Sequence, residues 1–132
     1  MSAKGVAILL LAALAVAGAT THVVIASWQD GPGKLDQWRL ACRARAMDTT
    51  SWVLACGQAA PAGTTPGEPT KAPMGVGHSL VIDPAGTIVA ELGDAPGLLL
   101  HDIDPGLAVA ARRDLPVLDN RVVDLPGVRR LA

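Results

Sequence analysis

The chain has 132 residues, of which 50% are hydrophobic, and its formal net charge at pH 7 is −1. This balance excludes a disordered tail, and the absence of a basic stripe argues against a nucleic-acid-binding protein. The length allows one domain or less. With three Trp and no Phe or Tyr, the core must be built from Ala, Val, Leu and Ile.

An apolar run from Gly5 to Ala19 opens the chain and admits two interpretations. Lys4 before the run and small residues at its end are typical of a secretory signal peptide, and the run is short for a membrane span. The alternative is a buried helix that ends at Gly18 and leads into a strand over residues 22–27. The local pattern alone favours the signal peptide.

A helix is predicted from Lys34 to about Asp48, because Leu35, Trp38 and Cys42 recur at helical spacing. Residues 51–56 have the composition of a buried strand. They are followed by a loop over residues 58–76 that is rich in Pro and Gly, and a loop of that length is usually functional or disordered.

Pro84-Ala85-Gly86 predicts a tight turn between strands at residues 78–83 and 87–92. Another strand is expected over residues 97–103. Asp104 can cap a short helix with Pro105 at its first position, and the tail beyond Leu115 is expected to be extended. The order of elements predicts an α/β fold, a layered sandwich that is truncated at its start.

The sequence offers little independent chemistry. The two cysteines, Cys42 and Cys56, are interpreted as reduced and buried thiols. The three histidines have no metal-ligand spacing, so neither a metal nor a cofactor is predicted. Ser79, His101 and Asp104 could be drawn as a catalytic triad, but no serine lies in a nucleophile-elbow motif.

Six short phrases follow one another between residues 10 and 121. They are Ala17-Gly18-Ala19 with Ala26-Ser27-Trp28; Gly31-Pro32-Gly33-Lys34-Leu35-Asp36-Gln37-Trp38; Arg43-Ala44-Arg45-Ala46-Met47-Asp48; Gly57-Gln58; Gly75-Val76-Gly77-His78-Ser79 with Asp83-Pro84-Ala85-Gly86; and Asp102-Ile103-Asp104 with Arg112-Arg113-Asp114-Leu115-Pro116. In this order they resemble the nitrilase superfamily of carbon–nitrogen hydrolases.

The resemblance implies a four-layer α-β-β-α sandwich whose subunits pair across a helical face. Residues 1–121 would then be a partial domain, with residues 1–19 as an apolar helix or signal-like segment and residues 122–132 as a tail. The family hydrolyses non-peptide C–N bonds in nitriles, amides and carbamoyl groups. It uses Cys as nucleophile, Glu as general base and Lys to stabilise the tetrahedral intermediate.

The family's triad cannot be assigned here. Its order along the chain is Glu, Lys, Cys, but Glu68 and Glu91 both follow Cys42 and Cys56. We expect both carboxylates to be solvated and both thiols to be packing residues. The family's nucleophile elbow would fall near Ser2, where nothing resembles it. We therefore predict no catalytic residue, and residues 10–19 take the place of the helix after the elbow.

The expected function is that of a C-terminal fragment of a cytoplasmic amidase or nitrilase-type enzyme, inactive by itself, whose parent is a homodimer. Ser27 and Trp28 are predicted remnants of the substrate-pocket wall, and His78 is expected to make structural hydrogen bonds. Two alternatives stay open. One is a non-catalytic partner, or a homo-oligomer, that docks through helix 34–48. The other is a small protein that is secreted or membrane-anchored through residues 5–19.

Overall fold

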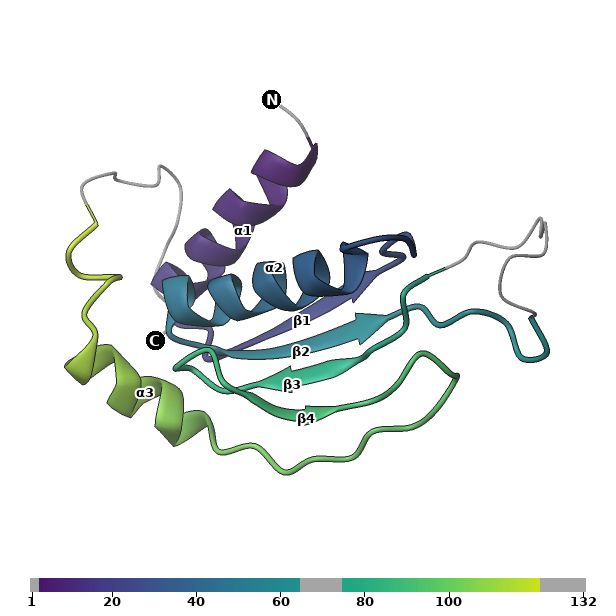
Figure 1. Cartoon of the computed structure of the whole chain (residues 1–132). Helices are drawn as coiled ribbons and strands as arrows, with labels where there is room; N and C mark the ends of the chain where they lie inside the picture. The colour runs from purple at the N-terminus through teal and green to yellow at the C-terminus, as the bar shows by residue number, and fades with distance from the viewer. Residues whose placement is uncertain (1–2, 65–74, 122–132) are drawn as a thin grey trace.

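The computed structural model describes residues 3–64 and 75–121, with side chains from residue 10 onward. The elements in chain order are α1 (Ala3–Ala17), β1 (Thr21–Ala26), α2 (Lys34–Thr49), β2 (Trp52–Gly57), β3 (Leu80–Ile82), β4 (Ile88–Glu91) and α3 (Pro105–Asp114) (Figure 1). The predicted α/β class is confirmed, as are the helix from Lys34 and the short helix from Pro105.

One four-stranded sheet, in the order β1-β2-β3-β4, organises the fold. β1 and β2 are parallel, with Thr21 opposite Trp52 and Ala26 opposite Gly57. Parallel neighbours need a crossover, which α2 provides. β2, β3 and β4 then pair antiparallel. The carboxyl ends of β1 and β2 therefore meet at one edge of the sheet, where ligands usually bind in open α/β sheets.

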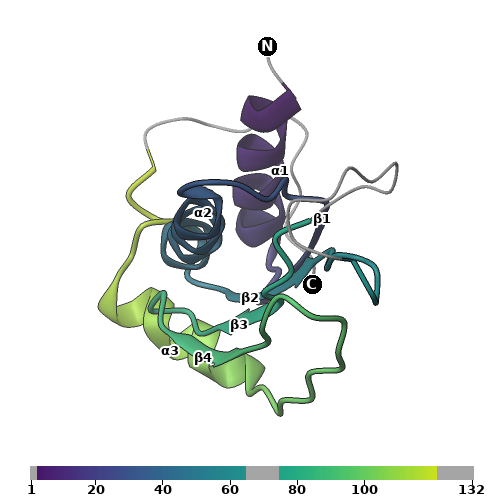
Figure 2. The ribbon, with the colours of Figure 1, turned by 45° about the vertical axis from the view of Figure 1, so that its right-hand side comes forward.

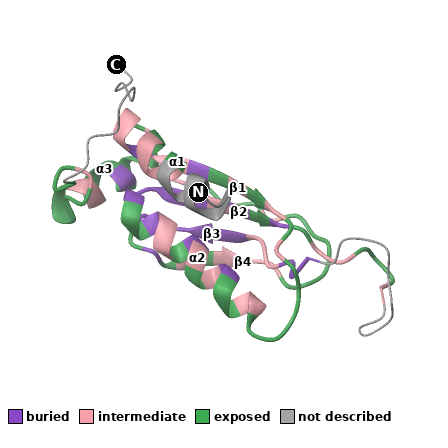
Figure 3. Cartoon of the chain, turned by 90° about the horizontal axis from the view of Figure 1, so that it is seen from above, coloured by how far each residue is buried: buried purple, intermediate pink, exposed green. Residues whose placement is uncertain are grey.

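The main core lies between α2 and one face of the sheet. Trp38, Cys42 and Ala46 recur every four residues, so they form one buried stripe along the helix. The stripe packs on alternate residues of the strands, because side chains one residue apart point to opposite faces. In Figure 3 the buried residues gather on this stripe and on the strands beneath it. The strand residues of this core are Val53, Ala55, Leu80 and Ile82.

The opposite face of the sheet is only partly covered. A smaller cluster of Trp52, Val81 and Ala108 joins the sheet to α3. On β1, by contrast, the residues Val23 and Ile25 are 64% and 81% exposed. The molecule therefore has one helix-covered face and one face that is half open.

Local capping explains the turn and the last helix. The Asp83 carboxylate accepts hydrogen bonds from the backbone N–H groups of Ala85 and Thr87 at 3.0 and 2.8 Å, which closes the predicted hairpin turn. Asp104 is the N-cap of α3, and its carboxylate accepts from Gly106 N–H at 2.8 Å.

Three local predictions are wrong. Residues 97–103 are not a strand, because they make no backbone hydrogen bond to any of the described strands. Residues 115–121 are not extended, since the Pro116 carbonyl accepts from the N–H of Asn120 and closes a turn. Cys56 is exposed rather than buried, because it lies on the half-open face of the sheet.

The apolar start of the chain forms α1, which leans beside α2 in Figure 2. Ala15 is buried there, and Gly18 ends the helix with φ 116°. No helix in residues 3–64 and 75–121 has the length and apolar character needed to cross a membrane. The cytoplasmic location and the signal-peptide alternative stay predictions.

Candidate active-site edge

The carboxyl-terminal edge of β1 and β2 is held together by backbone hydrogen bonds. Gln58 N–H donates to the Ala26 carbonyl at 3.0 Å, and Gly77 N–H donates to the Gln58 carbonyl at 3.0 Å. Val76 N–H donates to the Trp28 carbonyl at 2.8 Å. The segment before β3 therefore lies across the ends of both parallel strands.

Glycines make this close approach feasible. A Cβ on Gly57 would lie 2.0 Å from the Gly77 carbonyl oxygen, and a Cβ on Gly75 would lie 1.9 Å from the Gln58 carbonyl oxygen. Both distances are far inside van der Waals contact, and both neighbours are backbone atoms. The sequence phrases around Gly57 and Gly75 thus encode the contact between the two backbones.

Trp28 joins β1 to α2 at this edge. Its indole N–H donates to the Lys34 carbonyl at 3.1 Å, and its ring lies 5.8 Å from the Trp38 ring, centroid to centroid. Trp28 is half-buried, whereas Ser27 is exposed. The predicted role of both residues as a pocket wall stays a prediction.

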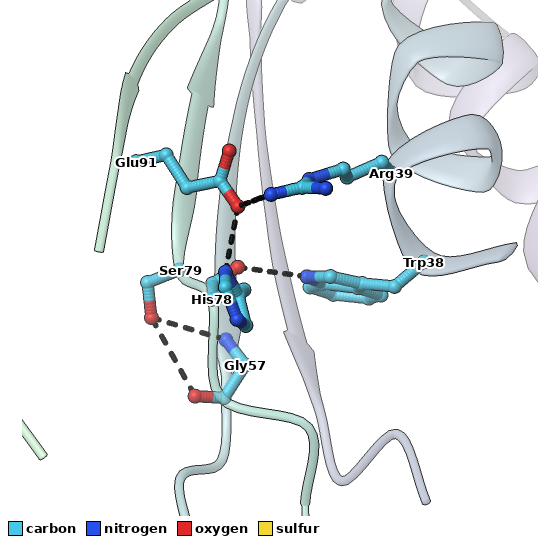
Figure 4. A network of polar contacts seen from close by, with 6 residues as sticks. All are labelled: Trp38, Arg39, Gly57, His78, Ser79 and Glu91. Atoms are coloured by element: carbon cyan, nitrogen blue, oxygen red, sulfur yellow. Dashed lines mark hydrogen bonds and ion pairs between the residues drawn. The ribbon is translucent and has the colours of Figure 1, made fainter. Parts of the chain in front are cut away.

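A polar network lies beside the glycine contact (Figure 4). The His78 ring nitrogen Nδ1 is 2.7 Å from Glu91 Oε1. The same carboxylate oxygen accepts from Arg39 Nε at 3.0 Å and from Arg39 Nη2 at 2.7 Å. One carboxylate therefore joins α2, β4 and the segment before β3.

The backbone around the network is fixed as well. Trp38 Nε1 donates to the His78 carbonyl at 2.9 Å, and Ser79 Oγ accepts from Gly57 N–H at 3.2 Å. His78 has φ 49°, a left-handed conformation that is uncommon for residues other than glycine. The expected hydrogen bonding of His78 is confirmed.

Electrostatics favour the ionised form of Glu91. Burial acts to raise the pKa of its carboxyl group, but the hydrogen bonds and positive charges of Arg39 and His78 outweigh burial and hold the pKa below its ordinary value. The expectation of a solvated Glu91 is wrong, because its side chain is 22% exposed and has two partners. Such a carboxylate suits an ion-pair network better than proton abstraction.

Two pockets flank His78. One, of about 300 Å³, is lined by Cys56, Gly57, Ser79 and the turn at residues 92–97. The other, of about 660 Å³, is lined by Asp30, Leu35 and the segments 60–64 and 94–96. Neither Ser27 nor Trp28 lines either pocket.

The two thiols differ in environment. Burial raises the pKa of the Cys42 thiol to about 12, so this thiol stays protonated and unreactive at neutral pH. Cys56 is exposed in the smaller pocket. Among the described residues, neither thiol has a hydrogen bond to a carboxylate or a histidine that could activate it.

The other sequence candidates do not come together. Ser79 bonds to Gly57, the ring of His101 lies 6.4 Å from that of Trp52, and Asp104 caps α3. Residues 3–64 and 75–121 contain no group of three or more His, Cys, Asp or Glu side chains placed to hold a metal ion.

Comparison with known proteins identifies relatives of this arrangement. Residues 5–113 match the sequence model of the carbon–nitrogen hydrolase family. The chain is 50% identical over 110 residues to a Mycobacterium tuberculosis hydrolase, which covers 82% of this chain and 39% of the relative. It is 33% identical over 109 residues to the deaminated glutathione amidase of Escherichia coli O157:H7, covering 83% of this chain and 37% of that enzyme.

This chain is also similar to solved protein structures. Saccharomyces cerevisiae Nit3, a member of branch 10 of the nitrilase superfamily, aligns with a TM-score of 0.72 and 28% identity over 88% of this chain and 40% of Nit3. The Caenorhabditis elegans NitFhit protein aligns with a TM-score of 0.67 and 25% identity, over 84% of this chain and 26% of that protein. The chain thus spans about two fifths of the length of the first curated relatives.

Proposed function

Because the chain belongs to the carbon–nitrogen hydrolase family, we propose that it supplies one part of a domain that hydrolyses a C–N bond in a small amide, and that this part has no turnover by itself. The amide class is taken from the relatives named deaminated glutathione amidase. The proposal concerns the strand edge of Trp28, Gly57 and His78, which lies at the carboxyl ends of parallel strands.

The state of the two thiols carries the proposal. A thiol hydrolase needs a thiolate, a carboxylate to take its proton and a cation near the developing oxyanion. Cys42 is buried with a pKa of about 12, and Cys56 has no activating partner among the described residues. Glu91 is the carboxylate nearest His78, and it is already paired with Arg39 and His78.

A chimera tests the positive half of the proposal. Residues 5–113 would replace the matching segment of the Escherichia coli deaminated glutathione amidase, and hydrolysis of deaminated glutathione would be followed by mass spectrometry. We expect turnover by the chimera and none by the isolated 132-residue chain. A folded but inactive chimera contradicts the first half. Turnover by the isolated chain that Cys42→Ala or Cys56→Ala abolishes contradicts the second.

A second candidate function is non-catalytic docking onto a family subunit, or onto another copy, through α2. One observation favours it: Leu40 and Met47 lie seven residues apart on α2, on one face, and are 69% and 45% exposed. Leu40→Glu should then abolish co-purification with a full-length family member or self-association in gel filtration. Unchanged association after this substitution rules α2 out.

A further inference from the structure

The amino-terminal end of the parallel strands, opposite the edge of Trp28 and Gly57, is tied together by one side chain. Arg112 on α3 donates through Nη2 to the Ala19 carbonyl, in the link between α1 and β1. The same nitrogen donates to Ser51 Oγ at 3.1 Å, in the link between α2 and β2. A single guanidinium therefore holds α3 to the two segments from which the parallel strands begin.

The Ala19 carbonyl depends on this guanidinium. Ser51 Oγ lies 3.3 Å from the Ala19 carbonyl oxygen and 2.9 Å from the Thr49 carbonyl oxygen. A hydroxyl group has one proton, so Ser51 can donate to one of these carbonyls at a time while it accepts from Arg112. The shorter distance favours Thr49, which leaves Arg112 as the main donor to Ala19.

His22 is buried close to this contact. It lies on β1, three residues after Ala19, and is 2% exposed. Strand alternation places its side chain on the face of Val24 and Ala26, which is the face that α2 covers. Within residues 3–64 and 75–121, neither His22 Nε2 nor Arg112 Nε has a hydrogen-bond partner. Buried polar groups with incomplete hydrogen bonding are costly, so this end of the sheet is only weakly held.

The surroundings of His22 favour its neutral form. Burial, and then the charge of Arg112, lower the pKa of His22 from 6.5. Arg45 and Asp48, near the end of α2, pair with each other at 2.7 Å, and the charge of Asp119 opposes the lowering of the Arg112 pKa by burial. The described side chains of α1 and β2 include no Asp, Glu, His, Lys or Arg. A proton on His22 would therefore place a second positive charge beside Arg112 in a buried site.

α1 is attached to the rest of the molecule less firmly than α2. Ala15 is the one buried residue among the described side chains of α1, and this helix rises away from the sheet in Figure 1. α2, by contrast, buries Trp38, Cys42 and Ala46. Segments with few buried apolar contacts open at a lower free energy than the core does. α1 can therefore detach while α2 stays packed on the sheet.

We propose that His22 and Arg112 form an acid-sensitive latch, in which a proton on His22 displaces Arg112 from Ala19 and Ser51 and releases α1 from the sheet. The proton favours the released form because water can then solvate both charges, whereas the latched form holds them together in a buried site. The core between α2 and the sheet stays folded. The latch lies at the opposite end of the parallel strands from the candidate active-site edge, so it is independent of the proposed function.

Amide hydrogen exchange at pH 7.5 and 5.5 tests the latch. If His22 titrates at its ordinary pKa of 6.5 in the released form and stays neutral in the latched form, the opening constant of α1 rises about tenfold over this range. After correction for intrinsic exchange, the amides of residues 11–17 should therefore lose about tenfold in protection. At both pH values they should exchange at least tenfold faster than the amides of Trp38, Cys42 and Ala46, and with a weaker urea dependence, which indicates partial opening.

Substitutions of His22 assign the titrating group. His22→Leu should remove the pH dependence of exchange in α1. His22→Gln, which keeps a polar side chain but does not titrate in this range, gives the same decision if His22→Leu does not fold. His101→Asn, at an exposed position, is the matched control and should retain the tenfold change.

Substitutions on α3 test the role of the guanidinium. Arg112→Gln should lower the protection of α1 at least tenfold already at pH 7.5, because the donor to Ala19 is lost. Arg113→Gln, at the exposed neighbouring position, should change it less than twofold. The proposal is overturned by equal effects of these two substitutions, by a pH dependence that survives in the His22 variants, or by α1 amides that exchange only together with those of α2.

Discussion

Arg39 on α2 and Glu91 on β4 form an ion pair across 52 residues of sequence, with 2.7 Å between Arg39 Nη2 and Glu91 Oε1. The same oxygen contacts His78 Nδ1. The pair therefore joins α2 to β4 at the edge of the sheet, and through His78 it also contacts the segment that lies across the ends of β1 and β2.

Glu91→Gln should lower the free energy of unfolding by about 1 kcal/mol at pH 7, since Arg39 is partly exposed and solvent weakens such pairs. Urea unfolding at low salt measures the change. Asp48→Asn is the matched control, because it removes an ion pair with Arg45 that lies within one helix, with the Asp48 side chain 61% exposed. If Glu91→Gln lowers the free energy of unfolding no more than Asp48→Asn does, the ion pair between α2 and β4 stabilises the fold no more than an exposed pair within one helix.

The same pair sets a pH window. The pKa of Glu91 is lowered from its ordinary value of 4.5 in the folded state, so its contribution to stability is present above pH 4.5 and is lost as pH falls through the folded pKa. The stability difference between the wild type and Glu91→Gln should therefore shrink from pH 7 to pH 3. A difference that is constant over this range would show that the charge of Glu91 does not stabilise the fold.

His22 predicts a second pH effect, with a different group. It is 2% exposed on β1, and its Nε2 has no hydrogen-bond partner among the described residues. Burial, and then the charge of Arg112, lower its pKa from 6.5. The unfolded chain then binds a proton more readily than the folded one, so stability should fall as pH drops below 6.5.

His22→Leu should flatten the stability profile between pH 7.5 and 5.5, because it removes the buried titrating ring and leaves no unsatisfied nitrogen. His101→Asn, at an exposed position, is the control and should preserve the slope. Urea midpoints at five pH values suffice for the measurement. An unchanged slope in His22→Leu would assign the acid sensitivity to another group.

Sequence patterns recovered the elements whose signals are local. The helical spacing of Leu35, Trp38 and Cys42, the Pro84–Gly86 turn and the Asp104 cap each act over a few residues, and each formed as predicted. The ordered phrases likewise identified the family, which the family match confirms.

The predictions that were wrong depend on distant neighbours. Residues 97–103 have the alternation of a strand, but a strand exists only where a ladder partner lies beside it. Cys56 has the sequence context of a buried residue, yet its exposure depends on what covers the other face of the sheet. The contact of Arg39 with Glu91 left no trace in the sequence, because nothing in a 52-residue separation marks two charges as neighbours.

Gly57→Ala should destabilise the edge of the parallel strands. Its new Cβ would lie 2.0 Å from the Gly77 carbonyl oxygen, so the two backbones must separate, and overpacking of this kind costs about 3 kcal/mol. Gly93→Ala is the matched control, because no atom lies within 4 Å of its added Cβ. Thermal unfolding of both variants tests the expectation, and equal midpoints would show that the backbone contact is dispensable.

The two cysteines should differ sharply in reactivity. Cys56 is exposed, whereas Cys42 is 3% exposed and its thiol has a pKa of about 12. The thiolate is the reactive species, so Cys42 is protected both by protonation and by its packing between α2 and the sheet. At pH 7.5, 5,5′-dithiobis(2-nitrobenzoic acid) should modify one thiol per chain rapidly, and the second only at the rate of unfolding.

Two variants assign the rapid phase. Cys56→Ser should abolish it, whereas Cys42→Ala should retain it. Cys42→Ala should also lower the thermal midpoint, because this substitution leaves a cavity against Val53 and Ile82. Rapid modification of both thiols in the folded chain would mean that α2 does not stay packed on the sheet, and the elevated pKa of Cys42 would lose its cause.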